Sequence, residues 1–235
     1  MAIEGAGKVL FLLDPIGARW IGTLNASAES LDHLYSTDRP RVETYRAMVE
    51  EIMAWVRKGL DVCVAFYGHP GVFVDPSHEA IRQARAEGFN ARMIPGVSAE
   101  DCLIADLGFD PGQWGSHSYE ASEFLLFGRT ADPSVHLILW QVGALGEVAA
   151  RRGPNTAALQ MLAERLAGRY GPDHEAVLYE ASPYPMGGGL VRRLPLSELA
   201  AAEVSPMSTL YVPPAGKPSL DAVMARAFGV GTDGV

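Results

Sequence analysis

The chain has 235 residues, of which 48% are hydrophobic and 20% charged, a composition typical of one large or two small globular domains. Its formal net charge of -9 argues against a broad nucleic-acid-binding surface. No apolar run approaches the ~20 residues of a membrane span, and the N-terminal residues lack the basic and long apolar regions of a signal peptide. We therefore expect a cytoplasmic protein that binds neither nucleic acid nor membrane.

In the first half of the chain, apolar runs alternate with helical patterns. The predicted elements are, in order, strand 8–14, helix 41–59, strand 61–67, helix 75–88, strand 91–94 and a helix from Ser98. The two long strands are continuous apolar runs, which is typical of a parallel sheet covered on both faces. The first of these helices follows Pro40 and stops at Gly59, residues that commonly start and end helices.

The second half of the chain begins after residues 108–123, which we interpret as a linker because they are rich in Gly, Ser, Asp and Pro and show no periodicity. The predicted elements beyond it are strand 136–143, helix 155–171, strand 175–181, a helix after Ser197, strand 208–214 and a short helix from Ser219. This alternation indicates an α/β chain with mostly parallel strands. We expect two α/β domains, residues 1–118 and 119–235.

The two cysteines, Cys63 and Cys102, lie in apolar surroundings on separate predicted elements. A single disulfide is one interpretation. Two reduced core thiols agree better with a cytosolic protein.

Two glycine-containing segments follow predicted strands, at the edge where open α/β sheets bind ligands. They are "YGHPGVF", Tyr67–Phe73, and "PGVSAEDC", residues 95–102. Glycine lets the backbone approach a ligand closely, so that its N–H and C=O groups can bind. Either segment alone could be an ordinary turn from strand to helix. Two in the same half favour a ligand site.

Other readings of these turns have less support. Ser98 and Asp101 have the spacing of a helix capping box, and no G-x-S-x-G motif suggests that Ser98 is a nucleophile. His69 and His78 lack metal-ligand spacing, so we predict no metal site. The glycine-rich phosphate and dinucleotide motifs are absent.

Tyr35, Arg41 and Tyr45 form a further candidate cluster. Arg41 and Tyr45 are four residues apart, so they share a helix face, and Tyr35 precedes them in a loop. Such residues can simply provide packing and surface. A guanidinium beside a phenol can instead favour the phenolate, which could hold or deprotonate a weakly acidic group.

Several segments together resemble the methyltransferase domain of the borosin family. They are "FYGHPGVFVDPSHEAI", "GFNARMIPGVSAEDCLIADLGFDP", "SYEASEFLL", "HLILWQVGALG", "STLYVPP" and "RVETY". The resemblance extends from about Lys8 to Pro214. Borosin enzymes share the fold of the tetrapyrrole methylases (class III methyltransferases) and N-methylate backbone amides of a ribosomally made peptide.

The resemblance implies two α/β domains that hold S-adenosylmethionine between them. The implied cofactor-binding residues are Tyr67, Gly68, His69, Pro70, Gly71, Val72, Phe73, Ser98, Ala99, Tyr119, Glu120, Gln141, Val142, Gly143, Ser208 and Thr209. Arg41 and Tyr45 match the family's catalytic pair, and Tyr35 is the candidate third member.

The chain also departs from the family pattern in two places. Family members begin with one more strand and a glycine-rich turn before the strand that starts at Lys8, and we expect this element to be missing here. Either the true start lies further upstream or the protein is a shortened member. Fused borosins carry their substrate peptide after the domain, so we expect a split arrangement with a separate precursor peptide, and a homodimer. The alternatives are a tetrapyrrole or corrin small-molecule methyltransferase and a truncated, non-catalytic peptide-binding partner.

Overall fold

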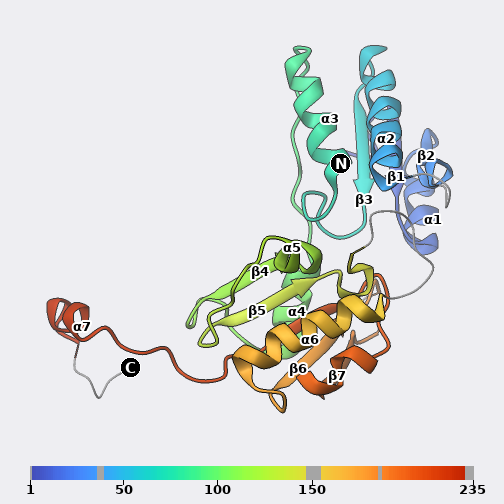
Figure 1. The fold of residues 1–235 in the computed structure, drawn as a ribbon. Coiled ribbons are helices and arrows are strands. Elements are labelled where there is room, and N and C mark those ends of the chain that lie inside the picture. The colour runs from blue at the N-terminus through green and yellow to red at the C-terminus, as the bar shows by residue number, and fades with distance from the viewer. Residues whose placement is uncertain (1, 36–39, 147–154, 185–186, 231–235) are drawn as a thin grey trace. The chain divides into compact units, whose positions relative to one another are not determined.

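The computed structural model describes residues 2–35, 40–146, 155–184 and 187–230. The chain forms two compact units (Figure 1). Of the described residues, those up to 106 and those within 181–188 form the first unit. Those within 107–146, within 153–180 and from 189 onward form the second. The domain limits expected from the sequence, 1–118 and 119–235, stay a prediction.

The first unit contains a three-stranded parallel sheet. Its strands are β1 (Lys8–Leu12), β2 (Ala28–Ser30) and β3 (Val62–Phe66), in the order β2-β1-β3. Its helices are α1 (Pro15–Leu24), the short 3-10 helix η1 (Asp32–Leu34), α2 (Arg41–Arg57), α3 (Asp75–Ala86) and α4 (Ala99–Leu107), whose last residue falls in the second unit. The predicted parallel sheet is confirmed for this unit.

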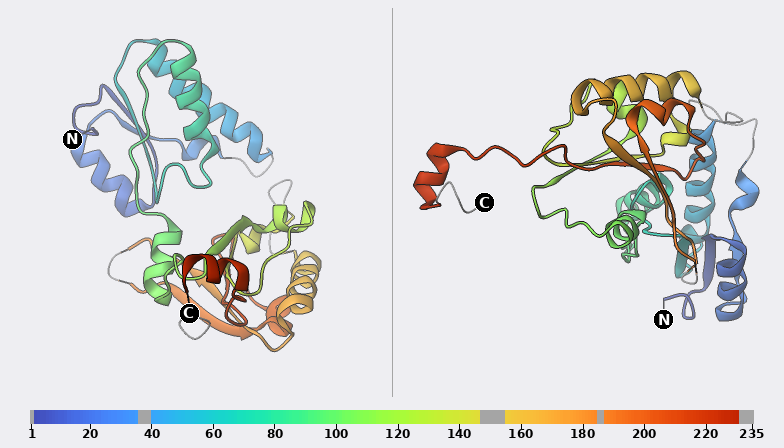
Figure 2. Two further views of the ribbon diagram at one scale, coloured as in Figure 1. Left: turned by 90° about the vertical axis from the view of Figure 1, so that its left-hand side faces the viewer. Right: turned by 90° about the horizontal axis from the view of Figure 1, so that it is seen from below.

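Alternating side chains of β1 supply two cores on opposite faces of this sheet. Leu10 and Leu12 pack with Met48 of α2 and with residues of α3, whereas Val9 and Phe11 pack around Ile21 of α1. Successive side chains of a strand point to opposite faces, so a continuous apolar run is what a three-layer arrangement requires. Figure 2 shows α2 and α3 side by side in the first unit.

The strand predicted over residues 91–94 is not formed. The segment is extended, and Ala91 accepts a hydrogen bond from the Arg85 side chain, but no strand ladder joins the segment to β3. Among the described residues β3 pairs with β1 alone, and all five of its apolar residues are only half-buried. A short apolar run indicates a strand but cannot show whether a partner lies within hydrogen-bonding distance.

The second unit contains a five-stranded sheet in the order β4-β5-β8-β6-β7. The strands are β4 (Ser116–Glu120), β5 (His136–Trp140), β6 (Glu175–Glu180), β7 (Leu190–Pro195) and β8 (Thr209–Val212). The helices and 3-10 helices are α5 (Ala121–Leu126), η2 (Val142–Ala144), α6 (Thr156–Tyr170), η3 (Leu196–Ala201) and α7 (Ala222–Phe228).

Two sequence-based expectations are wrong for this unit. Only β4 and β5 pair in parallel, because β8 enters antiparallel between β5 and β6, and β7 returns antiparallel beside β6. The segment interpreted as a linker, residues 108–123, contains β4 and the start of α5. Both β4 and β7 lie at the edges of the sheet and carry many polar residues, so neither shows the apolar run that indicates a strand.

The second unit has one large core between the sheet and α6. Leu137, Leu139 and Leu178 of the sheet pack with Leu162 and Leu166 of α6. The apolar residues of α6 recur at helical spacing, which is why this helix was predictable. Asn155 caps its N-terminus by accepting from the N–H of Ala158 at 3.2 Å.

A buried polar pair also stabilises this sheet. The ring of His136 on β5 lies 2.7 Å from the hydroxyl of Tyr211 on β8, measured from Nδ1, and Phe109 stacks on both rings. Burial lowers the pKa of His136 and raises the pKa of Tyr211 to about 12. Both groups are therefore neutral at pH 7. The His136 ring also hydrogen-bonds the backbone of Gln113, which leaves Nδ1 to accept from the Tyr211 hydroxyl.

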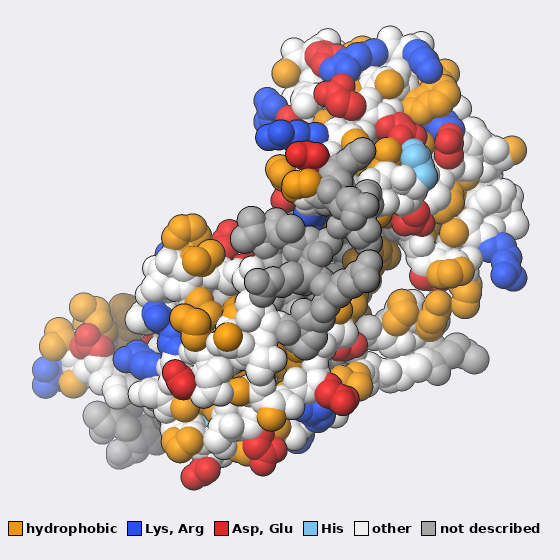
Figure 3. All heavy atoms as spheres, turned by 45° about the vertical axis from the view of Figure 1, so that its right-hand side comes forward, with side chains coloured by type: hydrophobic (Ala, Val, Ile, Leu, Met, Phe, Trp, Pro, Cys, Tyr) orange, Lys and Arg blue, Asp and Glu red, His pale blue; other side chains and the backbone are white. Residues whose placement is uncertain are grey.

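The described residues also limit other kinds of site. Both cysteines are free thiols, as expected. No described helix is long and apolar enough to cross a membrane. In the same part of the chain, no three His, Cys, Asp or Glu side chains cluster as a metal ion would need. Acidic and basic side chains are interspersed on the face shown in Figure 3.

The Tyr211→Phe variant should destabilise the second unit by about 1–3 kcal/mol, because it leaves a buried imidazole nitrogen without a donor. Amide hydrogen exchange in β5 and β8 measures the change. Wild-type stability should also fall above pH 10, because Tyr211 binds its proton more tightly when folded than when unfolded. The variant should lose less stability in that range. Equal exchange in both proteins at pH 7 would contradict a stabilising role for the hydroxyl.

Candidate functional site

Two glycine-containing turns of the first unit lie against each other. The first, Tyr67–Phe73, follows β3, and the second, residues 95–98, precedes α4. A Cβ atom on Gly96 would stand 2.5 Å from the carbonyl oxygen of Gly68, and Gly68 itself has a φ of +72°. Glycine alone tolerates both this backbone approach and the left-handed conformation at little cost. The structure thus brings together two turns that the sequence could only identify separately.

Hydrogen bonds with α3 fix the first turn. The Ser77 hydroxyl donates to the carbonyl of Pro70, and the His78 ring, through Nε2, lies 2.9 Å from the carbonyl of Gly71. The N–H of Gly71 in turn donates to Nδ1 of His69 at 3.0 Å. An imidazole that accepts at Nδ1 carries its proton on Nε2. The turn is therefore held in one conformation by the helix that follows it.

Ser98 and Asp101 form the predicted capping box at the start of α4. The N–H and the hydroxyl of Ser98 each donate to the Asp101 carboxylate at 2.7 Å, and the N–H of Asp101 lies 3.2 Å from the Ser98 oxygen. The Ser98 hydroxyl is the main cause that lowers the pKa of Asp101, so the carboxylate is charged at neutral pH. Ser98 caps the helix, and its neighbour Ala99 is the first helical residue.

The candidate catalytic residues gather beside the first turn. Tyr35 follows η1, and Arg41 and Tyr45 lie in the first turns of α2. Burial raises the pKa of Tyr35, and the nearby phenols of Tyr45 and Tyr67 raise it further, whereas Arg41 lowers it. Tyr67 belongs to the glycine turn, so this electrostatic contact joins the tyrosine cluster to the turn.

The balance of these effects differs from the sequence-based hypothesis. We expected Arg41 to depress a phenol pKa, and its effect on both Tyr35 and Tyr45 has that direction. Burial is the larger effect, however, and the pKa of each phenol is raised overall. Both side chains are therefore protonated at neutral pH. They can donate hydrogen bonds, and they become bases only through a minor phenolate form.

In the second unit, the remaining candidate residues lie at one end of the strands, where β4 and β5 end and β8 begins. Glu120 ends β4 opposite Trp140, the last residue of β5, and Gln141 follows directly. Ser208 and Thr209 lie at the same strand ends because β8 runs antiparallel to β5 and begins there. Glu120 also caps α5, accepting from the N–H of Glu123 at 2.7 Å. Tyr119 points its ring toward Phe124, with centroids 5.8 Å apart.

The segment Gln141–Gly143 is packed tightly against residues 205–208. The N–H of Val142 donates to the carbonyl of Ser208 at 3.0 Å. A Cβ atom on Gly143 would collide with the carbonyl oxygen of Ser205, so a glycine is required. Gln141 has a φ of +58°, which is uncommon for a residue with a side chain. Such unusual backbone geometry is frequent at functional sites.

Sequence reasoning missed Glu180, which lies at the same strand ends as these residues. Its carboxylate accepts from the hydroxyls of Ser205 and Ser208, both at 2.6 Å. The signal was present, because Glu180 is the polar residue that ends the apolar strand β6. Ligands bind beyond the carboxyl ends of strands in open α/β sheets, and the same expectation applied to the end of β6 would have selected Glu180.

These features fit S-adenosylmethionine, the cofactor that the sequence implied. Each unit presents turns in which glycines bring the backbone close to neighbouring groups, leaving amide and carbonyl groups to hydrogen-bond a nucleoside or an amino acid. The second unit adds the Glu180 carboxylate and the hydroxyls of Ser205 and Ser208 at the same strand ends. Such groups can bind hydroxyl and amino groups without a metal ion.

Solved structures show the class of protein to which this fold belongs. The chain resembles a cobalt-precorrin-4 methyltransferase with a TM-score of 0.60 and 14% identity, over 92% of this chain and 87% of that one. It also resembles a Thermus thermophilus uroporphyrin-III C-methyltransferase in complex with S-adenosylhomocysteine, with a TM-score of 0.56 and 16% identity, over 91% and 88%. The fold is therefore that of this class of α/β methyltransferases.

The family follows from the sequence model of the tetrapyrrole (corrin/porphyrin) methylases, which matches residues 6–199. The chain belongs to this family, whose members use S-adenosylmethionine. It is an S-adenosylmethionine-dependent methyltransferase by family, as the sequence resemblance implied.

Curated relatives are more similar in sequence than the solved structures. The methyltransferase and gymnopeptide precursor protein of Gymnopus fusipes is 43% identical over 232 residues, 95% of this chain and 55% of the relative. A type I borosin precursor protein of Gymnopilus junonius is 40% identical over 97% of this chain and 55% of its own length. The omphalotin A precursor protein of Omphalotus olearius is 41% identical over 90% and 52%. The chain thus spans about half the length of these relatives.

The Gly96→Ala variant should lose about 1–3 kcal/mol of unfolding free energy, because the new methyl group meets the Gly68 carbonyl and the backbone must shift. Gly22→Ala is the matched control. Gly22 lies within α1 with no atom within 4 Å of its new Cβ, and should gain up to about 1 kcal/mol. Denaturant unfolding followed by hydrogen exchange in the first unit measures both. Equal stability of the two variants would show that the two turns are not in close contact.

Proposed function

We propose that this methyltransferase N-methylates backbone amides of a ribosomally made precursor peptide. The main observation behind this proposal is the cluster of Tyr35, Arg41 and Tyr45 beside the glycine turn of the first unit. Relatives with about 40% identity are methyltransferases joined to a cyclic-peptide precursor, which supports the same substrate class.

The chemistry explains why such a cluster is needed. An amide nitrogen is a poor nucleophile, because its lone pair is delocalised into the carbonyl group. Methylation requires removal of the N–H proton and stabilisation of negative charge on the amide oxygen. S-adenosylmethionine supplies an electrophilic methyl group on its sulfonium. The protein must supply the base and the groups that stabilise the oxygen.

We assign these two tasks to the tyrosine cluster. Arg41 stabilises the negative charge that develops on the amide oxygen, as a preorganised cation does. Tyr35 or Tyr45 accepts the N–H proton, directly or through a water molecule, acting as a general base. Since burial keeps both phenols protonated at neutral pH, the fraction of active enzyme is set by how far Arg41 offsets burial.

The cofactor-binding residues remain part of the proposal. In the first unit they are Tyr67–Phe73 with Ser98 and Ala99. In the second unit they are Tyr119, Glu120, Gln141–Gly143, Ser208 and Thr209. Holding the methyl group in line with the amide nitrogen contributes the proximity effect.

A small-molecule tetrapyrrole acceptor is less well supported. The solved tetrapyrrole enzymes reported above share at most 16% identity with this chain, whereas the peptide-linked relatives share about 40%. A polyanionic ring would also favour a basic protein, and the net charge here is -9. The separate precursor chain and the homodimer stay predictions, which methylation of an added peptide and the solution mass would test.

Titration of the purified chain with S-adenosylmethionine by calorimetry should give saturable, one-to-one binding. The Arg41→Ala variant should bind the cofactor with nearly unchanged affinity, because the guanidinium acts on the peptide amide. A folded wild-type sample that binds no cofactor would contradict an enzymatic role and favour a non-catalytic binding partner.

Methylation should be lost in the same Arg41→Ala variant by about 10²–10³-fold. The substrate is a synthetic peptide with the gymnopeptide segment of the Gymnopus fusipes relative, and mass spectrometry counts the added methyl groups. Arg46→Ala, an exposed arginine of the same helix, is the matched control and should keep wild-type activity. Wild-type activity of Arg41→Ala would refute the assigned role. Methylation of a tetrapyrrole but of no peptide would refute the substrate class.

The methylation rate should rise with pH over the range between 7 and 10, because the raised pKa values of Tyr35 and Tyr45 keep the phenolate population small. Arg41→Lys retains a positive charge but not the guanidinium geometry. Arg41→Ala should move the alkaline limb of the pH–kcat profile to higher pH. Arg41→Lys should move it in the same direction by less. A profile that is flat from pH 7 to 10 would exclude a phenol as the base.

A further inference from the structure

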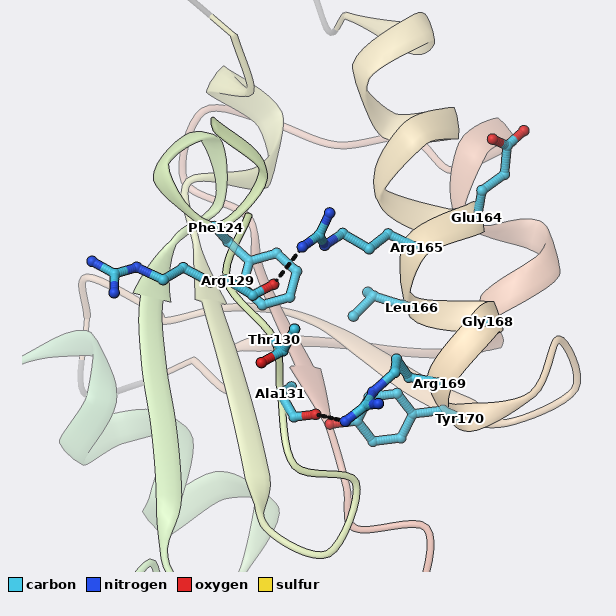
Figure 4. A pocket seen from close by; sticks show the side chains of 10 residues that line it. All are labelled: Phe124, Arg129, Thr130, Ala131, Glu164, Arg165, Leu166, Gly168, Arg169 and Tyr170. Carbon is cyan, nitrogen blue, oxygen red and sulfur yellow. Dashed lines mark hydrogen bonds between the residues drawn. The ribbon is translucent and has the colours of Figure 1, made fainter. Parts of the chain in front are cut away.

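A pocket in the second unit is lined by none of the residues assigned above, although one lining residue, Phe124, lies next to Tyr119. It has a volume of about 340 Å³ and opens between α6 and the segment that follows α5 (Figure 4). The buried side chains of Phe124, Leu166 and Tyr170 form its apolar lining. Arg165 and Arg169 of α6 extend from the helix toward the opposite segment, residues 129–131, and Glu164 points away from them.

The two arginines are held by backbone groups. Arg165 donates to the carbonyl of Arg129 at 2.7 Å, and Arg169 donates to the carbonyl of Ala131 at 3.0 Å. A guanidinium has five N–H donors, so each retains most of them for a ligand. These two backbone bonds also fix the direction of the side chains, which lowers the entropy lost on binding an anion.

Positive charge exceeds negative charge in the lining of this pocket, which contains Arg129, Arg165 and Arg169 but only one carboxylate, Glu164. Neither Arg165 nor Arg169 belongs to any ion pair formed among the described residues. Asp132 is close enough for Arg169 to lower its pKa, so this carboxylate offsets part of the charge of Arg169, although it accepts from the N–H and hydroxyl of Ser134 at 2.9 and 2.8 Å. In a chain of net charge -9, such a positive site attracts anionic ligands selectively.

Apolar groups next to the arginines indicate the kind of ligand. Leu126 and Phe127, at the end of α5, are 79% and 66% exposed. Arg129 lies 5.9 Å from the Phe127 ring centroid, and Arg165 lies 5.6 Å from that of Phe124. Aromatic residues and arginines together are the side chains enriched in protein and peptide interfaces. A small anion would use the arginines but would leave the apolar groups exposed.

We infer that this pocket docks an acidic segment of the peptide substrate, through Asp or Glu side chains that meet Arg165 and Arg169. The inference rests on the proposed function, since it names how that peptide is recognised outside the methylated residues. Docking at a second place raises the local concentration of the peptide at the site of chemistry. It also allows peptides of different methylated sequence to share one binding signal.

The test is fluorescence anisotropy with the full chain and two labelled peptides. One peptide contains Glu and Leu residues, and the other has Gln at every Glu position. The Glu peptide should bind about tenfold more tightly, and its affinity should fall as salt is added. Equal affinity for the two peptides would overturn the inference. Displacement of the Glu peptide by an equal concentration of inorganic phosphate would also overturn it, in favour of a small-anion site.

The variant that removes the positive charge is Arg165→Gln with Arg169→Gln. Glutamine is uncharged and ends two bonds short of the arginine nitrogens that donate to the two carbonyl groups, so cofactor binding is used to check that the variant is folded. This variant should bind the Glu peptide about fivefold or more weakly. The matched control, Arg192→Gln with Arg226→Gln, removes two exposed arginines elsewhere in the second unit and should bind as wild type. Unchanged affinity in the first variant would overturn the inference.

Calorimetry with S-adenosylmethionine separates this inference from the proposed function. Normal cofactor binding by the Arg165 and Arg169 variant shows that it is folded. Cofactor binding and peptide methylation without any preference for the Glu peptide would refute the docking pocket alone. Preference for the Glu peptide without methylation of any peptide would refute the proposed reaction and leave the pocket supported.

Discussion

Close approach of backbone to backbone is the constraint on which the candidate residues of each unit depend. In the first unit Gly96 meets the carbonyl of Gly68, and in the second Gly143 meets that of Ser205. Each contact joins two turns at the end of a strand, and each excludes any side chain larger than hydrogen. The polar groups around them, such as Asp101 and Glu180, then hydrogen-bond the turns in place. A cofactor that binds through backbone groups needs this rigidity before it arrives.

The tyrosine cluster shows two opposing effects on the same groups. Burial in the first unit disfavours a phenolate, and the Arg41 guanidinium favours it. The cluster is not sealed from solvent, since Tyr35 is 53% exposed. The two effects therefore oppose each other on phenols that water can still reach.

The sequence predicted some elements of each unit and missed others, for identifiable reasons. In the first unit, α1 and β2 were not predicted. Strands β1 and β3 are continuous apolar runs, and α2 and α6 show clear helical spacing, so these elements were found. Strands β4 and β7 were missed because they lie at sheet edges and carry polar residues such as His117 and Arg192. Antiparallel pairing was also missed, since an apolar run carries no information about the direction of its neighbour.

The candidate site was predictable where local chemistry left a mark on the sequence. The capping box of Ser98 and Asp101 follows from spacing, and the glycine turns follow from composition. The contact between Gly68 and Gly96 did not, because it depends on the tertiary arrangement of two turns almost thirty residues apart. The net direction of the Tyr35 and Tyr45 pKa values was also beyond the sequence, since burial decided it.

Two of the buried tyrosines of the second unit, Tyr170 and Tyr211, make this half of the protein its own optical probe. Burial raises the pKa of Tyr170 and of Tyr211 to about 12, far above that of a tyrosine in an unfolded chain. Near pH 11 the folded second unit keeps both phenols in the neutral form, whereas its unfolded chain absorbs as phenolate. Ultraviolet absorbance in mild alkali can thus follow the opening of this unit in real time, without a label.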